Sequence, residues 1–364
     1  MPPLQTMPKA SAPTADDYYL SDDELLTEDE KMIRDSARQF TQQELLPKIR
    51  AWDEGNIEPY KRKEDLTRDI ARKIGSQLNL FGATLPEMQK YIGDTEFILM
   101  TPAGYGVAMR EIEAADTSFR SLASVQSSLG MYAIYSYGSQ EQKKKWLGPL
   151  YRGEKLVCFG LTEPQGGSDP VNMKTTAEKK GTEWVLNGTK VWITNGFAEV
   201  AVVWAKTPEG IRGFLVEKGT PGYSVRHEVK WAMRSGTASS LTFNNCKIPE
   251  DNILPKSTAG MKCFLNCLSE ARFSIAWGCV GSARACLEET IAFAKERQIF
   301  GRPLAAKQAI QVKLVWCLNE IENANLVALQ LARLKAKGRL HFGHISLSKY
   351  NNVAKSIEVA QHCV

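Results

Sequence analysis

The chain has 364 residues, with 46 Lys and Arg against 41 Asp and Glu, which gives a net charge of +5. This small, scattered charge argues against a nucleic-acid-binding surface, and no run of residues approaches the roughly 18 apolar positions of a membrane span. The length predicts two or three domains. None of the eight cysteines forms a Cys-x-x-Cys pair, which favours buried, reduced thiols in a reducing compartment.

The N-terminal part of the chain is predicted to be a tail followed by a helical domain. Residues 1–19 are rich in proline, which predicts disorder, and lack the arginine-rich amphipathic face of a mitochondrial presequence. Thr27 and Glu30 have the spacing of a capping box that opens a helix. Residues 20–155 therefore form one predicted α-helical domain. Its helical stretches lie near 27–46, 66–78, 105–115, 125–137 and 141–146.

The hydrophobic period changes to two after Leu156, which is typical of strands. Turn signals separate several short strand candidates, among them Asn187-Gly188 and Asn195-Gly196. The pattern predicts a small antiparallel β-domain over residues 156–255.

Helical periodicity returns in residues 256–364. Apolar residues between Ile310 and Leu331 recur at alternating steps of 4 and 3, which predicts the seam of a helical bundle. A partner helix is predicted from about Met261 to Arg297. A third begins near Ser346, and the sequence reaches Val364 inside its pattern, so we expect a truncated bundle. The fold class is thus α+β, with a helical, a β and a second helical domain in order.

The stretch Cys158–Pro170 reads as a strand that runs into a Gly-Gly-Ser-Asp turn. Glycines let backbone N–H groups approach a ligand closely, and the hydroxyls of Thr162 and Ser168 add donors and acceptors. An ordinary turn between two strands is the alternative reading of this stretch. His341 and His344 lie three residues apart, but no carboxylate or cysteine cluster accompanies them, so no metal site is predicted.

These motifs, together with Trp192-Ile193-Thr194 and Arg297-Gln298-Ile299-Phe300-Gly301, resemble the flavin-contacting signatures of the acyl-CoA dehydrogenase family. The resemblance implies that FAD lies between the middle domain and the C-terminal bundle. Arg297 and Gln308 are implied to reach its adenine-diphosphate half from a neighbouring subunit. The full set of implied FAD contacts is Phe159, Gly160, Leu161, Thr162, Gly167, Ser168, Trp192, Ile193, Thr194, Arg297, Phe300 and Gln308.

The segment from Glu111 to Ser124 is most similar to that of the glutaryl-CoA dehydrogenase members of the family. A buried arginine is costly unless an anion pairs with it, which favours a dicarboxylic acyl group opposite Arg120. A surface ion pair between Arg120 and Glu113 is the alternative. The implied substrate contacts are Glu113, Arg120, Ser121, Ser124 and Ser168 for the acyl group, and Leu265, Leu268, Ser269 and Arg272 for CoA.

The resemblance implies oxidation and decarboxylation of glutaryl-CoA to crotonyl-CoA in amino-acid degradation. It also implies electron transfer to an electron-transfer flavoprotein, a homotetramer and a location in the mitochondrial matrix, with the cytoplasm and the peroxisome as alternative locations. The alternatives are a truncated, inactive member that still binds flavin or acyl-CoA, and a short-chain acyl-CoA oxidase.

Two departures from the family pattern bear on these expectations. The family's glutamate base would lie beyond Val364, and no other Glu is assigned its role, so the 364 residues alone are not expected to bleach FAD with glutaryl-CoA. Residues 88–104 replace a short glycine turn with a longer, partly apolar stretch, which predicts an altered wall near the acyl pocket.

Overall fold

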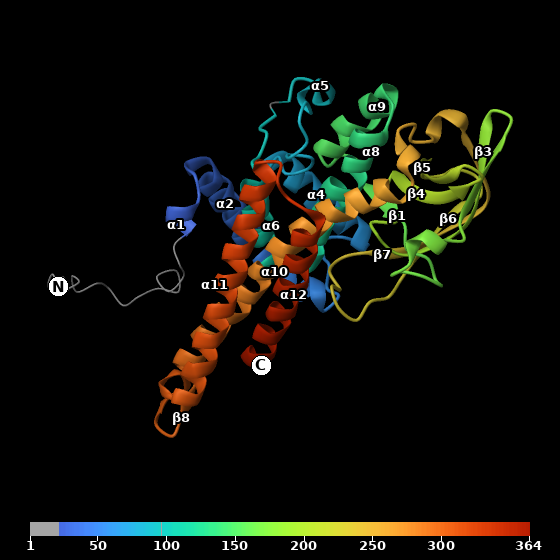
Figure 1. Cartoon of the computed structure of the whole chain (residues 1–364). Helices are drawn as coiled ribbons and strands as arrows, with labels where there is room; N and C mark the ends of the chain where they lie inside the picture. Colours follow the sequence, from blue (N-terminus) through green and yellow to red (C-terminus); the bar gives the residue numbers. More distant parts are fainter. Residues whose placement is uncertain (1–21, 96) are drawn as a thin grey trace.

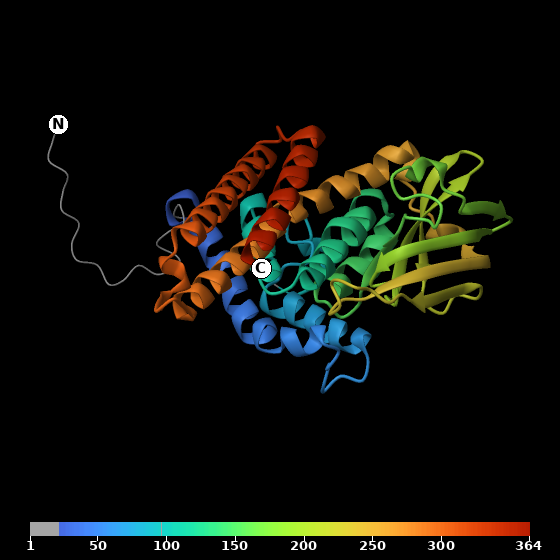
Figure 2. The same cartoon turned by 90° about the horizontal axis from the view of Figure 1, so that it is seen from below.

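The computed structural model describes residues 22–95 and 97–364. Helices, a β-sheet and a second set of helices follow one another along the chain, and Figure 2 shows the sheet at one end of the molecule. The predicted tail, residues 1–19, lies outside the described residues. None of the described helices combines the length and the apolar character needed to cross a membrane.

The N-terminal helices pack around the buried helix α6. Their bounds are α1 Asp22–Leu25, α2 Glu28–Phe40, α3 Leu46–Asp53, α4 Lys63–Gln77, α5 Gln89–Ile92, α6 Pro102–Glu113, α7 Thr117–Ser124, α8 Tyr132–Tyr137 and α9 Gln140–Tyr151. The predicted capping box opens α2, because the Thr27 hydroxyl accepts from Glu30 N and the Glu30 carboxylate accepts from Thr27 N. The same carboxylate binds Arg333 of the C-terminal bundle at 2.6 Å, so the cap also joins two domains.

Residues 88–95 and 97–104 are folded against their neighbours. The Gln89 side-chain amide donates to the carbonyls of Gly93 and Thr95, and its oxygen accepts from Phe97 N. The Phe97 ring packs edge-on against Tyr151 of α9, with 5.9 Å between centroids. Figure 1 places α5 beside α9 at the top of the molecule. The described residues of this stretch are therefore held in place by internal hydrogen bonds and by packing against α9.

The middle sheet has seven strands: β1 Val157–Gly160, β2 Thr176–Lys180, β3 Glu183–Thr194, β4 Val200–Thr207, β5 Gly210–Glu217, β6 Tyr223–His227 and β7 Ala238–Pro249. Most neighbours are antiparallel, but β4 pairs parallel with β1, and with β2 at Thr176 and Lys206. The sheet is therefore mixed, and the prediction of an antiparallel domain was wrong around β4. The first strand enters from the helical domain, so its direction is set by the domain junction rather than by a hairpin.

Asn187-Gly188 is part of the continuous strand β3, contrary to the predicted turn. The register shifts between Leu186 and Gly188, which marks a β-bulge. Gly188 has φ +147°, and a Cβ atom there would lie 2.6 Å from Thr175 Cα. Close approach of the Thr175 backbone thus explains the glycine.

Substituting Gly188 is expected to destabilise the β-domain. Gly188→Ala combines an unfavourable φ with overlap against backbone, so we expect a loss above about 3 kcal/mol in the free energy of unfolding. Gly181→Ala is the matched control, because Gly181 also has positive φ but nothing lies within 4 Å of its added Cβ. We expect about 1 kcal/mol there. Equal losses in denaturant titrations of the two variants would contradict the bulge explanation.

The C-terminal bundle consists of α10 Met261–Glu296, α11 Gln308–Ala336 and α12 Phe342–Cys363, with the short strands β8 Gln298–Ile299 and β9 Arg302–Pro303 between the first two. The predicted seam is buried at Cys317, Ile321, Ala324, Ala328 and Leu331. The third helix begins at Phe342 rather than near Ser346, because His341 caps it by accepting from Gly343 N at 3.2 Å.

One buried amide ties the three bundle helices together. Asn352 of α12 donates from Nδ2 to the carbonyl of Ala276 in α10 at 2.9 Å and to that of Ala324 in α11 at 3.1 Å. Figure 1 shows α10 and α11 extending together to the hairpin at β8, away from the sheet.

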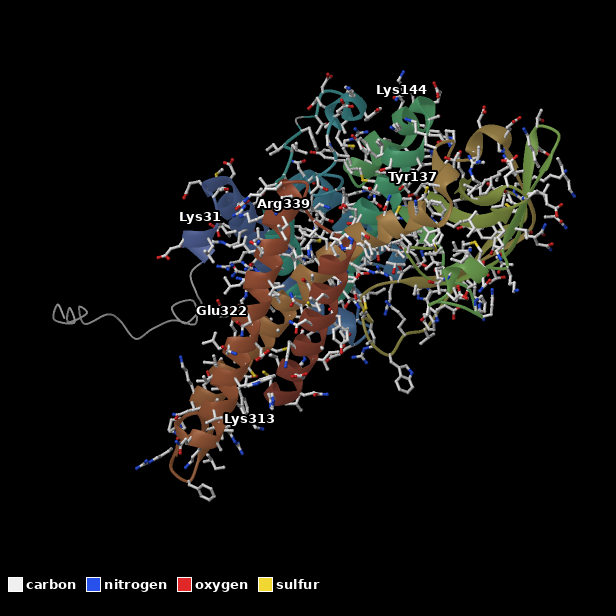
Figure 3. All side chains as sticks on the ribbon, viewed as in Figure 1. Lys31, Tyr137, Lys144, Lys313, Glu322 and Arg339 are labelled. Atoms are coloured by element: carbon white, nitrogen blue, oxygen red, sulfur yellow. The ribbon has the colours of Figure 1, made fainter. Side chains whose placement is uncertain are left out.

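The three domains meet around Trp204 of β4, which is fully buried. Its ring packs against Phe159 of β1 at 6.1 Å, Phe264 of α10 at 5.7 Å and Tyr137 of α8 at 6.4 Å between centroids. The Tyr137 hydroxyl also donates to the Cys263 carbonyl at 3.2 Å, and Figure 3 labels this tyrosine beside α10. This junction fixes the sheet against the helices, and the predicted flavin residues begin at Phe159 within β1 and continue into the loop after it.

Candidate functional site

The two stretches predicted to contact flavin lie side by side. After β1 the chain leaves the sheet at Leu161, and the Thr162 carbonyl accepts from Val191 N at 2.9 Å. The loop then turns back, so that a Cβ atom on Gly167 would lie 3.7 Å from the Thr162 methyl group. Gly167 and Ser168 are exposed, whereas Phe159, Gly160 and Leu161 are buried. The structure therefore brings the Thr162–Ser168 loop next to the end of β3.

The end of β3 presents an aromatic face. A register shift between Lys190 and Ile193 leaves Trp192 with φ +59°, and 61% of this tryptophan is exposed. Positive φ is uncommon for a bulky residue, and bulges often redirect a side chain beside a site. Ile193 is buried and Thr194 is half-buried. The end of β3 therefore directs the Trp192 indole toward solvent, away from the well-packed part of the strand.

These residues fit the flat, heteroatom-rich ring of a flavin. Trp192 offers an exposed aromatic surface, and Thr162, Ser168 and Thr194 offer hydroxyl groups on the adjacent loop and on the same strand end. Asn195 is 1% exposed, and its side-chain nitrogen Nδ2 has no hydrogen-bond partner among the described residues. A buried donor without a partner is costly, which is consistent with a site completed by a ligand.

A buried ion pair holds the base of this site. Lys190 is fully buried, and its Nζ lies 2.8 Å from Glu163 Oε1 and 3.1 Å from the Leu161 carbonyl. Burial lowers the pKa of Lys190 to about 8, although the pairing with Glu163 opposes the shift. Burial works against ionisation of Glu163 too, but hydrogen bonds from Lys174 N, Lys190 and Thr175 lower its pKa to about 2. The hydrogen bonds that Glu163 accepts therefore favour its ionised form.

A second buried ion pair lies where the acyl group was predicted to end. Arg120 Nε donates to Glu113 Oε2 at 2.5 Å, and the two side chains are 9% and 4% exposed. Glu113 ends α6, and Arg120 follows one turn into α7, after the Asp116 side chain caps that helix by accepting from Ser118 N. The Arg120–Glu113 pair of the alternative interpretation exists, but it is buried, so the alternative was wrong in placing the pair at the surface. The short helix–helix connection places both residues on the inner face.

Two residues of α10, Gly278 and Ser274, lie beside the predicted substrate contacts. Gly278 faces the ion pair so closely that an added Cβ atom would lie 1.8 Å from Glu113 Oε2. One turn earlier, the buried hydroxyl of Ser274 lies 2.7 Å from that of Ser124. Ser121 and Thr194 line the same small cavity, so one predicted acyl contact and one predicted flavin contact lie near each other.

The residues predicted to contact CoA lie on the first half of α10. Leu265 and Leu268 pack partly buried against the core, and the Ser269 hydroxyl donates to the Leu265 carbonyl at 3.0 Å. Within the part of the chain that the structure describes, no carboxylate pairs with the half-buried guanidinium of Arg272. This cation is therefore available to an anionic group.

The remaining predicted flavin contacts are not brought to the loop within one chain. Arg297, Phe300 and Gln308 lie at the far end of the α10–α11 hairpin (Figure 1). Phe300 is 89% exposed and has φ +51°. His341 and His344 belong to the cap of α12, and no group of metal ligands occurs among the described residues.

The site contains residues that the motifs did not indicate: Glu163, Lys190, Ser274 and Gly278. Glu163 lies in the recognised loop, and its burial follows from hydrogen bonds to Lys174 and Thr175. One signal in the sequence indicated Gly278, because glycine destabilises the interior of a long helix and usually marks close packing there.

The chain thus has a helical domain, a mixed β-sheet and a helical bundle, with exposed aromatic and hydroxyl groups at the end of β3 and on the loop after β1. Family models for the N-terminal, middle and C-terminal domains of acyl-CoA dehydrogenase match residues 27–154, 158–246 and 258–364. The chain belongs to the acyl-CoA dehydrogenase family. The predicted membership and the three-part fold are therefore confirmed.

Individual relatives share most of the chain. The mitochondrial short-chain specific acyl-CoA dehydrogenase of Mus musculus is 35% identical over 317 residues, which cover 85% of this chain and 73% of the relative. The crystal structure of glutaryl-CoA dehydrogenase from Mycobacterium smegmatis is 41% identical with a TM-score of 0.89, covering 96% of this chain and 86% of that one. A structure of a glutaryl-CoA dehydrogenase from the same organism in complex with FADH2 is 40% identical with a TM-score of 0.87, covering 94% and 85%.

Proposed function

We propose that this chain, an FAD-dependent acyl-CoA dehydrogenase by family, takes glutaryl-CoA as its substrate for oxidation and decarboxylation to crotonyl-CoA. The α-proton acceptor that this reaction needs is assigned to none of the described residues. The single observation that supports glutaryl-CoA as the substrate is the buried Arg120–Glu113 pair beside Ser124 and Gly278. A pocket for a simple fatty acyl group needs apolar walls, whereas a guanidinium fork matches a carboxylate. The similarity to glutaryl-CoA dehydrogenase supports the same choice.

The chain's own residues would serve binding and orientation. FAD, when bound, supplies the acceptor for the hydride that leaves Cβ of the acyl group. Trp192, Thr194 and the Thr162–Ser168 loop would hold the ring, and Arg120 would fix the distal carboxylate, so that the acyl carbons are oriented between the two anchors. Arg272 would bind a phosphate of CoA.

One observation favours a second candidate, the oxidation of a short-chain monocarboxylic acyl-CoA. Glu113 already neutralises Arg120 at 2.5 Å, so the pocket end does not need an anion from the substrate. The similarity to short-chain acyl-CoA dehydrogenase agrees with this reading. The two candidates differ in whether the substrate carboxylate displaces Glu113 from Arg120.

The assembly and the electron acceptor are part of the proposal. We propose a homotetramer in which Arg297, Phe300 and Gln308 of one subunit complete the FAD site of another, because these residues lie exposed at the hairpin end. We propose an electron-transfer flavoprotein as the acceptor, with an oxidase reaction as the competing outcome. Rapid consumption of dissolved oxygen with acyl-CoA would favour the oxidase. The mitochondrial matrix stays a prediction, since the relatives include a mammalian mitochondrial enzyme and a bacterial one.

The purified protein is expected to be yellow or to take up FAD. Removing the indole in Trp192→Ala should weaken FAD binding about tenfold, because an aromatic stacking contact is worth about 0.5–1.5 kcal/mol beyond its burial. Trp231→Ala is the matched control, since Trp231 is 97% exposed and lies on the β6–β7 loop. Quenching of flavin fluorescence measures both. A folded protein that ignores FAD would contradict the proposed function.

A further inference from the structure

We propose that Glu163 and Lys190 are positioning residues that clamp the 163–175 loop in the shape that presents Thr162 and Ser168 to the flavin. The proposal rests on the proposed function for the identity of the ligand. The clamp itself is defined by contacts within the chain, and it can be measured without any ligand.

The Glu163 carboxylate ties together the two ends of the loop. It accepts from Lys174 N at 2.5 Å, from Thr175 N at 3.0 Å and from the Thr175 hydroxyl at 2.6 Å. These partners lie 11 and 12 residues further along the chain. Between the ends, Pro164, Gln165 and residues 167–169 are exposed, whereas Glu163, Met173 and Thr175 are buried. One side chain therefore fixes both ends of a loop whose middle faces solvent.

Lys190 joins this clamp to the strand that carries Trp192. Its Nζ donates to Glu163 Oε1 and to the Leu161 carbonyl, so it bonds to residues on both sides of Thr162. The stem is packed as well, because a Cβ atom on Gly160 would lie 3.4 Å from Lys190 Cγ. The Lys190 side chain thus acts together with the Val191 N–Thr162 carbonyl hydrogen bond to hold the two flavin-contacting stretches at their distance.

Stability alone is a poor explanation for this pair. Desolvating two charges costs about as much as their attraction returns, and apolar residues of similar volume often stabilise a fold equally well. An apolar pair, however, could not accept two backbone N–H groups or donate to a carbonyl. Glu163 and Lys190 instead supply directional hydrogen bonds, which hold a flavin-binding loop in one conformation and which a hydrophobic core does not need.

The test compares Lys190→Met, which removes one charge of the pair, with Glu163→Gln/Lys190→Met, which removes both charges. In Lys190→Met we expect faster deuterium exchange at the amides of Lys174 and Thr175 and FAD binding weakened about tenfold, the cost of roughly one lost hydrogen bond. Glu163→Gln/Lys190→Met removes both charges and should recover thermal stability. Its FAD affinity should stay low, because Gln replaces one of the two oxygens that accept from Lys174 N and Thr175 N with an NH2 donor.

Lys179→Met is the matched control, since Lys179 forms an exposed ion pair with Glu250 in the same domain. We expect it to leave loop exchange and FAD affinity unchanged. If the double variant recovers FAD affinity together with stability, the pair serves stability only and the proposal is overturned. Unchanged amide exchange in Lys190→Met would overturn it too. If the unmodified protein does not bind FAD, the proposed function fails, while the exchange measurement still decides whether the clamp exists.

Discussion

Arg120→Gln is expected to weaken the binding of glutaryl-CoA by about 2–5 kcal/mol, a loss of about 30-fold to several thousandfold. Butyryl-CoA, which has no distal carboxylate, should lose much less. The guanidinium is buried, so the substrate carboxylate would meet it with little screening by solvent. Titration of the FAD-loaded protein with both thioesters, followed by fluorescence or calorimetry, measures the difference.

Comparing two substrates in one variant separates specificity from folding. Arg120→Gln leaves Glu113 buried without its cation, which costs stability for any ligand. That cost is common to both titrations and cancels in their ratio. Arg120→Lys retains the charge without the planar fork and should give an intermediate ratio. Equal losses for the two thioesters in Arg120→Gln would remove the argument for a dicarboxylic substrate.

Glu111→Gln is expected to destabilise the protein by about 3–5 kcal/mol, because it leaves buried guanidinium groups without their counter-charge. Glu111 is 1% exposed and accepts from Arg284 at 2.6 and 3.0 Å, from Arg110 at 3.1 Å and from Arg38 at 3.1 Å. The cluster joins α2, α6 and α10. Denaturant titration at pH 7 measures the loss. Glu54→Gln, which removes the exposed pair with Arg50, should cost only about 0.3–0.5 kcal/mol.

The same cluster predicts a dependence of stability on acid. Burial opposes ionisation of Glu111, but the charges of Arg284 and Arg110 hold its pKa well below the usual range. A carboxyl group with a lowered folded-state pKa stabilises the fold above its unfolded pKa, and that contribution is lost as the pH falls toward the folded value. The free energy of unfolding should therefore drop below about pH 4.5. The Glu111→Gln curve should be flatter over this range, and parallel curves would contradict the assignment.

Local signals in the sequence predicted the helices well. The Thr27 cap and the steps of 4 and 3 along α11 depend on neighbours within one or two turns, and both appear in the structure. The loop after β1 was also found from its own residues, because its glycines and hydroxyls are contiguous. Those features are set by short stretches of chain.

The features that were missed depend on contacts between distant segments. Asn187-Gly188 carries a hairpin signal, yet Thr175 packs onto Gly188 and turns it into a bulge within β3. Glu163 and Lys190 are 27 residues apart, and nothing in their spacing indicates a buried pair. The parallel pairing of β1 with β4 likewise follows from how the helical domain delivers the chain to the sheet.

A crystal structure of the FAD-loaded protein with bound glutaryl-CoA tests the central claim most directly. We expect the distal carboxylate of the substrate within about 3.2 Å of the Arg120 guanidinium. The acyl carbons should lie over the flavin, between Trp192 and Ser124. A complex in which Glu113 keeps Arg120 at its present distance, while the substrate carboxylate points to solvent, would contradict the proposed function.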